Sequence, residues 1–196
     1  TPTHYSYQLI PLLKKIRSRI AIPVVYNCSG YEKVDTLKAL EGLVDIYLPD
    51  FKYYADEIAL QYSGVSDYRD VATAAIREMY RQTGKIQMDN HGLLSRGLVV
   101  RHLVLPGNRN DSIAVLRHLA SVLPIEDFYL SLMNQYTPEF AKESKFDNLK
   151  RKTTSFEYNS VLKEAEAIGF SGCRQQRNSS GTFYVPNFQK DAVTFE

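Results

Sequence analysis

The sequence predicts an α/β fold built on a parallel sheet with crossover helices, either an open sheet or a barrel of the TIM type. Two observations predict it. Short β-rich apolar runs alternate with amphipathic helical stretches, and four strand-then-helix units follow one another along the chain. The run at 98–100 is continuously apolar, as expected where both faces of a parallel sheet are covered. With 196 residues, the chain is long enough to bury the core of one domain.

The first half of the chain contains two predicted strands. The first helix begins near Tyr7, because Pro11 is tolerated only in a first turn. Its apolar residues recur at the spacing of one helical face, at Leu9, Leu13, Ile16 and Ile20. The next expected elements are a buried strand over 22–26, a short helix over 34–40 and a second strand over 44–48.

The rest of the chain contains two more strands and three helices. Residues 85–97 are polar and have no clear period. Thr154 and Glu157 have the spacing of a capping box, so the last helix begins there and ends at Gly169. The other elements expected are a helix over 70–83 that stops at Gly84, a strand over 98–105, a helix capped by Asp111 or Ser112, and a strand over 128–133.

Composition excludes several classes of protein. The 24 basic and 22 acidic residues leave a net charge of +2, and no basic stripe or run of six like charges suggests nucleic-acid binding. No stretch of about 18 apolar residues predicts a membrane span. The chain has two cysteines, far apart, so we expect a soluble, cytoplasmic protein without a disulfide framework.

The end of the chain differs from the rest. Residues 1–170 contain the predicted strand and helix units, whereas 171–196 begin with a polar stretch and continue into a short apolar run at 182–185. We therefore expect one domain over 1–170 and an appendage over 171–196, with an edge strand at 182–185.

The candidate site lies beyond the carboxyl ends of the strands, where ligands of parallel α/β proteins bind. Asp50 and Lys52 are two apart in an extended segment, so both can face one ligand. Arg101 interrupts an apolar strand, and a buried guanidinium should meet a carboxylate, either Asp50 or a ligand's. The polar residues expected at these ends are Asn27, Ser29, Asp50, Lys52, Arg101 and Gln135.

Structural roles are an alternative for each of these residues. Asp50 follows a proline as turn formers do, Lys52 can be a solvated loop lysine, and Arg101 with Asp50 can be an ion pair that braces two strands. His102 is expected to be a hydrogen-bonded core or interface histidine. Cys28 and Cys173 lack redox spacing, and the histidines have no metal-ligand spacing, so no metal site is predicted.

Six segments in order resemble radical S-adenosylmethionine enzymes, and among them proteins like the pyruvate formate-lyase activating enzyme. The resemblance extends over roughly residues 1–170. The matching segments are TPTHY at 1–5, PVVYNCSGYE at 23–32, VDIYLPDFKY at 44–53, YSG at 62–64, VRHLVLPG at 100–107 and LMNQY at 132–136.

This resemblance implies a partial (β/α)6 barrel, open on one side, with S-adenosylmethionine lying across the strand ends. It implies that Asp50 and Lys52, in an Asp-x-Lys pattern, and Arg101 help to hold that cofactor. Asn27 and Ser29 stand where activating enzymes often have Asp-Thr-Asn-Gly, and Gln135 is near a position that is often His.

The [4Fe-4S] cluster of the family cannot be held by this chain. The family uses a Cys-x3-Cys-x2-Cys loop, because three thiolates leave one iron free for the cofactor. Here the two cysteines are 145 residues apart. We therefore expect the chain to be the C-terminal two thirds of such a protein, truncated at its N-terminus and inactive alone.

Three functions remain open. By resemblance, the parent protein cleaves S-adenosylmethionine reductively and forms a radical on a glycyl-radical enzyme or a smaller substrate; its catalytic residues are unknown. The second is an aldolase-like enzyme that forms a Schiff base on Lys52, beside the carboxylate of Asp50. The third is a non-catalytic scaffold whose exposed sheet edge allows self-association.

Overall fold

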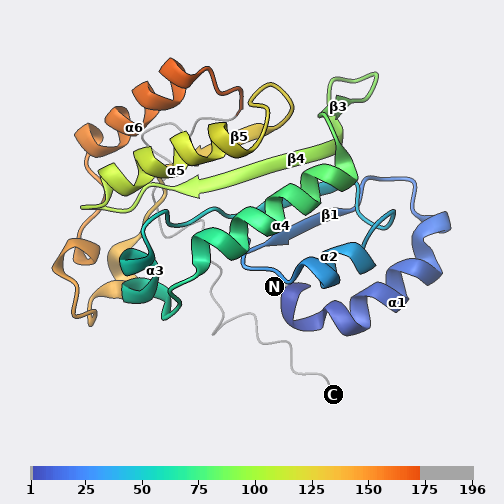
Figure 1. The fold of residues 1–196 in the computed structure, drawn as a ribbon, viewed down its shortest axis with the longest axis horizontal. Coiled ribbons are helices and arrows are strands. Elements are labelled where there is room, and N and C mark those ends of the chain that lie inside the picture. The colour runs from blue at the N-terminus through green and yellow to red at the C-terminus, as the bar shows by residue number, and fades with distance from the viewer. Residues whose placement is uncertain (1, 173–196) are drawn as a thin grey trace.

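The computed structural model describes residues 2–172, which form a mixed α/β fold on one sheet (Figure 1). Four strands are parallel and lie side by side in the order β1, β2, β4, β5, and the short β3 pairs antiparallel with β4. Their bounds are Val25–Cys28 for β1, Ile46–Pro49 for β2, Gln87–Met88 for β3, Leu94–Leu103 for β4 and Tyr129–Met133 for β5.

The helices connect the parallel strands. Helix α2 packs against α4, α4 packs against β2 and β4, and α5 packs against α6. In Figure 1, α2, α4 and α5 all lie in front of the strands, so they cover one face of the sheet. The bounds are Ser6–Ile16 for α1, Val34–Ala39 for α2, Asp56–Ser63 for α3, Tyr68–Thr83 for α4, Arg109–Val122 for α5 and Ser155–Ile168 for α6.

The four predicted strand-then-helix units are confirmed, and so are several helix ends. Helix α4 stops at Gly84 and α6 stops at Gly169, where φ is 65° and 95°. Glycine adopts these left-handed angles without the steric cost of a Cβ. Thr154 and Glu157 form the predicted capping box.

Several local expectations were wrong. The first strand, expected over 22–26, is β1 at Val25–Cys28. Helix α3 is an additional helix in the region that follows β2. The stretch without a clear period contains β3 and the start of β4, which pair in a short hairpin with a register shift. Asp111 does not cap α5, because the helix begins at Arg109 and its N-cap is Asn108. The carboxylate of Asp111 instead accepts hydrogen bonds from the segment after β2.

Strand β4 is buried more deeply on one face than on the other. Val100 and His102 are at most 1% exposed, whereas Arg101 and Leu103, which point to the other face, are only half-buried. The expectation that both faces of the sheet are fully covered was therefore wrong for the described residues. Arg101 and Leu103 instead line a cavity.

The C-terminal end of helix α1 is attached near the starts of β1 and β2. Two hydrogen bonds, 2.6 and 2.8 Å long, join the guanidinium Nη2 of Arg17 to the carboxylate of Asp45. Asp45 also accepts from the backbone N–H of Val24, at 2.8 Å. The carboxylate of Asp45, just before β2, thus joins Arg17, at the C-terminal end of α1, to Val24, just before β1.

The appendage predicted over 171–196 lies almost entirely outside the described residues, and so do its edge strand and Cys173. Ser171 is described, and its carbonyl accepts from the N–H of Leu130 on β5, at 2.9 Å. Within residues 2–172, no helix is long and apolar enough to cross a lipid bilayer.

Glu78 holds two side chains of its own helix, α4, and one of them, Gln82, reaches α2 and β2. Its carboxylate accepts two hydrogen bonds from Arg81, both 2.9 Å, and one from Gln82, at 2.7 Å. Gln82 donates in turn to the carbonyl of Leu37 on α2 and accepts from the hydroxyl of Tyr47 on β2. The guanidinium of Arg81 and the hydrogen bonds lower the pKa of Glu78 to about 2.

We predict that Glu78 stabilises the fold only when it is ionised. Because its folded pKa is below its ordinary value of 4.5, the contribution is fully present above about pH 4.5 and is lost as pH falls towards 2. Glu78→Gln should reduce the free energy of unfolding by about 1 kcal/mol at pH 7, and the deficit should shrink at acid pH. Urea unfolding between pH 3 and 7 measures it.

The exposed carboxylate of Glu143 provides the control. Glu143→Gln should leave the free energy of unfolding within about 0.5 kcal/mol of the wild type at every pH. A Glu78→Gln deficit that stays constant between pH 7 and 3 would contradict the prediction.

Candidate functional site

Two adjoining cavities lie at the carboxyl ends of the parallel strands. The first has a volume of about 350 Å³ and the second about 580 Å³, and they share Asp50, Lys52 and Arg101 as lining residues. Gln135 lines the first cavity, and Asn27 and Ser29 line the second. The six residues expected at the strand ends are thus brought together here, and their role in binding stays a prediction.

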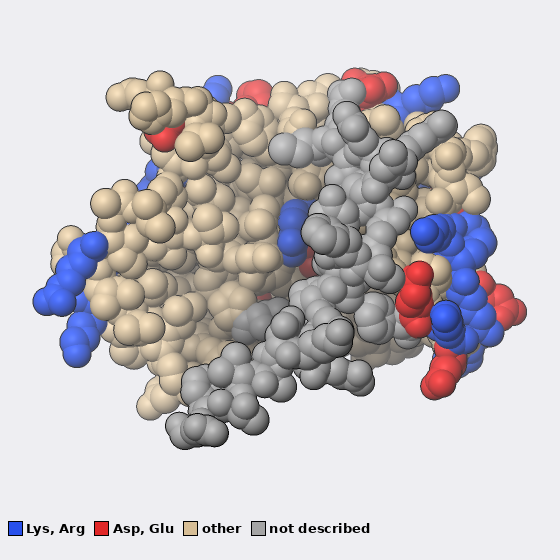
Figure 2. Space-filling model, turned by 180° about the vertical axis from the view of Figure 1, so that it is seen from behind, with Lys and Arg blue, Asp and Glu red and all other residues tan. Residues whose placement is uncertain are grey.

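The surroundings of the cavities are mostly uncharged. Leu103, Leu105, Met133 and Tyr53 line the first cavity, and side chains of α1 and β1 line the second. Figure 2, which views the molecule from behind, shows a face built largely of uncharged residues, with a basic side chain visible near its centre. A partly buried charge in such surroundings interacts more strongly with a ligand than a fully exposed charge does, because water screens it less.

Arg101 and Asp50 form an ion pair across neighbouring strand ends. The distance from Nη2 of Arg101 to Oδ1 of Asp50 is 2.6 Å, which confirms that the guanidinium meets a carboxylate. Burial raises the pKa of Asp50 from its ordinary value, and the charges of Arg101 and Lys52 oppose that shift. The Nε of Arg101 is buried and has no hydrogen-bond partner among the described residues.

The charges that line the two cavities do not balance. Among the lining residues, two cations, Lys52 and Arg101, face one carboxylate, Asp50. With Asp50 ionised, the lining carries one net positive charge. This arrangement favours a ligand with an anionic group, and Asp50 adds an acceptor for hydroxyl or amino groups.

His102 anchors the segment that follows β2. Its Nδ1 lies 2.7 Å from the carbonyl oxygen of Phe51. Because a carbonyl oxygen can only accept, Nδ1 carries the proton and donates the hydrogen bond. Burial lowers the pKa of His102 to about 4, and the ring is neutral at pH 7. The interpretation of His102 as a hydrogen-bonded core histidine is confirmed. The N–H of Phe51 also donates to the carbonyl of Arg101, at 2.8 Å.

Asp111 anchors the same segment further along. Its carboxylate accepts from the N–H of Ala55, at 2.8 Å, and from the N–H of Tyr54, at 3.2 Å. Burial raises the pKa of Asp111, and both backbone donors oppose that shift. Sequence reasoning missed this role because an acidic residue near a helix start is also typical of a cap.

Glu32 is a buried carboxyl group beside β1. It accepts hydrogen bonds from the hydroxyl groups of Thr3 and Tyr26, the latter at 3.5 Å. Burial raises the pKa of Glu32, and it raises the pKa of the Cys28 thiol to about 12. Cys28 is therefore a protonated thiol at neutral pH, as expected for a small buried residue and not for a nucleophile.

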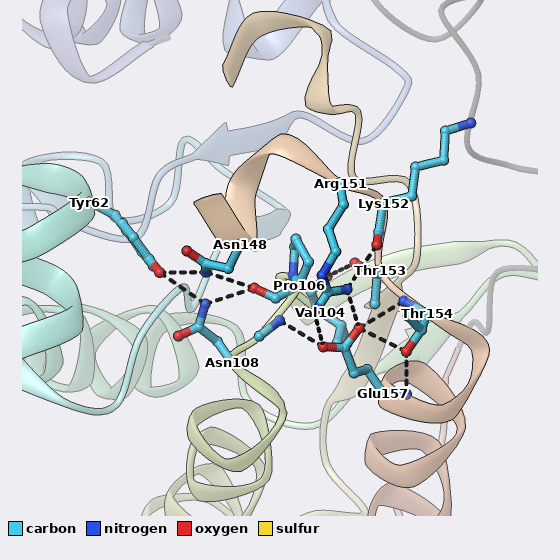
Figure 3. A network of polar contacts seen from close by, with 11 residues as sticks. Tyr62, Val104, Pro106, Asn108, Asn148, Arg151, Lys152, Thr153, Thr154 and Glu157 are labelled. Atoms are coloured by element: carbon cyan, nitrogen blue, oxygen red, sulfur yellow. Dashed lines mark hydrogen bonds and ion pairs between the residues drawn. The ribbon is translucent and has the colours of Figure 1, made fainter. Parts of the chain in front are cut away.

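The loop after β4, which contributes Leu105 to the first cavity, is held by a polar network (Figure 3). The carboxylate of Glu157 accepts from the N–H of Gly107, at 2.7 Å, and from Thr154 and Arg151. These donors lower the pKa of Glu157, so the carboxylate stays ionised. The start of α6 is thereby fastened to the rim of the cavity.

A second part of this network holds Pro106. Its carbonyl accepts from the side-chain amides of Asn108 and Asn148, at 3.1 and 2.9 Å. Both amides also donate to the hydroxyl of Tyr62 on α3. In Figure 3 these side chains converge from three separate elements. The loop after β4 is thus fixed by Asn108, Asn148 and Tyr62.

Among residues 2–172, no three His, Cys, Asp or Glu side chains gather as ligands for a metal ion. The full sequence contains two cysteines, and Cys28 is buried in the core. The residues of this chain therefore do not fit a cluster that needs three thiolates.

Comparison with known proteins gives the fold a precedent. No family model matches the chain. A crystal structure of a domain of pyruvate-formate lyase-activating enzyme from Bacteroides vulgatus superimposes with a TM-score of 0.62 and 13% identity, over 89% of this chain and 94% of that one. This chain has the fold of that domain. The similarity supports, at the level of the fold, the resemblance that the sequence segments predict.

A curated relative is more similar in sequence. It is an uncharacterized protein of Methanocaldococcus jannaschii, 27% identical over 166 residues, which is 84% of this chain. The match covers 44% of the relative, so the chain spans less than half of that protein's length.

We predict that Gly30 is essential to the packing of β1 against the end of β2. Its φ is +80°, and a Cβ there would lie 1.9 Å from the carbonyl oxygen of Asp50. Gly30→Ala should therefore reduce the free energy of unfolding by about 3 kcal/mol or more. Urea unfolding at pH 7 measures the loss.

Gly42 is the matched control, with a φ of +76° and no atom within 4 Å of an added Cβ. Gly42→Ala should reduce the free energy of unfolding by only about 1 kcal/mol, which is the cost of a positive φ for a residue with a Cβ. Equal losses for the two variants would contradict a collision at Asp50.

Proposed function

We propose that this chain binds S-adenosylmethionine in the two adjoining cavities and belongs to a radical S-adenosylmethionine enzyme similar to activating enzymes. The single observation that carries the proposal is the gathering of Asp50, Lys52 and Arg101 where the cavities meet. The fold shared with a domain of pyruvate-formate lyase-activating enzyme supports it.

The chemistry of the lining residues fits the groups of S-adenosylmethionine. Its ribose hydroxyls and amino group are donors, for which the Asp50 carboxylate is an acceptor. Its carboxylate is an anion, for which Lys52 and Arg101 are partners. Asn27, Ser29 and Gln135 add hydrogen-bonding groups around the rim. The apolar walls provide surface for the adenine ring.

On this proposal, the radical chemistry of the cofactor belongs to the whole protein and not to the residues of this chain alone. When bound, S-adenosylmethionine would supply a radical by reductive cleavage, and the electron would come from a [4Fe-4S] cluster that the residues of this chain do not hold. The residues of this chain hold and orient the cofactor and do not ligate the cluster. On this proposal the sheet is part of a partial (β/α) barrel, and the radical acceptor is a glycyl-radical enzyme or a smaller substrate.

A Schiff-base function remains the second candidate, because Lys52 lines both cavities beside the Asp50 carboxylate. The two functions differ in a measurable way. Borohydride reduction in the presence of a carbonyl substrate would leave a permanent mass increase on Lys52 only if a Schiff base forms there.

We predict that the chain binds S-adenosylmethionine and that Asp50→Asn and Arg101→Met each weaken binding at least tenfold. Each variant removes a charged hydrogen-bonding group, and a tenfold change corresponds to about 1.4 kcal/mol. Titration calorimetry measures the Kd, and thermal unfolding confirms that each variant is folded.

The control is Lys163→Met, which removes an exposed cation on α6. Its Kd should equal that of the wild type. A wild-type chain that does not bind S-adenosylmethionine, or a folded Asp50→Asn variant with unchanged Kd, would contradict the proposal.

A further inference from the structure

We propose that Tyr68 is a positioning residue, whose hydroxyl sets the end of β1 against the end of β2 and thereby aligns Ser29 with Asp50 and Lys52. The inference rests on the proposed function, since it assigns Tyr68 to the same binding site. Tyr68 is the first residue of α4 and lines neither cavity. It therefore acts through the backbone of its neighbours.

The hydroxyl of Tyr68 contacts three backbone groups from two strand ends. Its oxygen lies 3.0 Å from the carbonyl oxygen of Ser29 and 3.1 Å from that of Asp50. The N–H of Lys52 donates to the same hydroxyl, at 3.0 Å. One phenolic proton is thus shared by two carbonyl acceptors, while the oxygen accepts from a third backbone group.

The space for this hydroxyl is provided by Gly30. A Cβ at position 30 would lie 3.3 Å from the Tyr68 hydroxyl, as well as colliding with Asp50. The absence of a side chain there allows the two strand ends and the tyrosine to meet. The contact is therefore a property of three segments together, two strand ends and the start of a helix.

The ring of Tyr68 is held by other aromatic rings. It stacks on Tyr31 with the ring centroids 6.0 Å apart, and it makes edge contacts with Phe51 and Tyr53. The residue is only 3% exposed, and burial raises the pKa of its hydroxyl. The hydroxyl therefore stays protonated and can donate throughout the ordinary pH range.

Such positioning matters for binding because ordering a backbone costs free energy. If residues 50–52 were free to move, a ligand would have to order them on binding and its affinity would fall. The Tyr68 hydroxyl fixes the backbone on both sides of Phe51 before a ligand arrives. Ser29 and Lys52, which line the second cavity, are thereby held at a fixed distance from each other.

The test is Tyr68→Phe, which keeps the ring and removes the hydroxyl. The matched control is Tyr158→Phe, because Tyr158 is also buried, 4% exposed, and its hydroxyl also donates to a strand carbonyl, that of Leu132, at 3.1 Å. Two measurements are made on the whole chain. Calorimetry gives the Kd for S-adenosylmethionine, and NMR-detected amide exchange gives the protection of the Lys52 N–H.

We expect Tyr68→Phe to weaken binding about tenfold and to accelerate exchange at Lys52 at least tenfold. Tyr158→Phe should lose similar thermal stability without either change, which separates positioning from general destabilisation. Unchanged exchange at Lys52 in Tyr68→Phe would overturn the inference, and so would an equal loss of binding in both variants.

Failure of the proposed function has a different signature. If the wild type does not bind S-adenosylmethionine, the binding assignment is wrong, and the exchange measurement alone then decides the positioning role. Accelerated exchange confined to Tyr68→Phe would support the role for whichever ligand the site takes, and unchanged exchange would overturn it.

Discussion

Anchoring of the backbone where β2 ends is the constraint on which the candidate site depends. The N–H and the carbonyl of Phe51 are hydrogen-bonded to Arg101 and His102 on β4. The N–H of Lys52 donates to the hydroxyl of Tyr68. Further along, Asp111 accepts from Tyr54 and Ala55. Because these bonds come from three neighbouring elements, the side chains of residues 50 and 52 are presented from a rigid segment. Precise sites require such support.

The uneven burial of the sheet explains why cavities exist at all. Helices α2, α4 and α5 cover one face, and the strand residues that point to it are completely buried. Residues such as Arg101 and Leu103 point to the other face, where they remain accessible to a ligand. The ion pair with Asp50 neutralises one cation, and Lys52 leaves the lining positive. The uneven burial therefore accounts for the space, and the lining residues Asp50, Lys52 and Arg101 account for its charge.

Much of the candidate site was accessible from the sequence, because residues that follow parallel strands must meet at one edge. This rule brought together Asp50, Arg101 and Gln135 without knowledge of any contact. The supporting residues were not accessible in this way. Tyr68 begins an ordinary amphipathic helix, and Asp111 has the position of a cap. Their roles depend on partners 16 and 57 residues away, which no local pattern encodes.

The sequence by itself determined the chain order of the four parallel strands and of every helix except α3, together with several helix ends, since periodicity, glycine and capping act over a few residues. It also determined that this chain cannot ligate a three-cysteine cluster. The tertiary structure decided which face of β4 is open, how residues 85–97 pair, and that Arg101 meets Asp50 at 2.6 Å. These features depend on which distant segments pack together, and long-range packing is settled only when the whole chain folds.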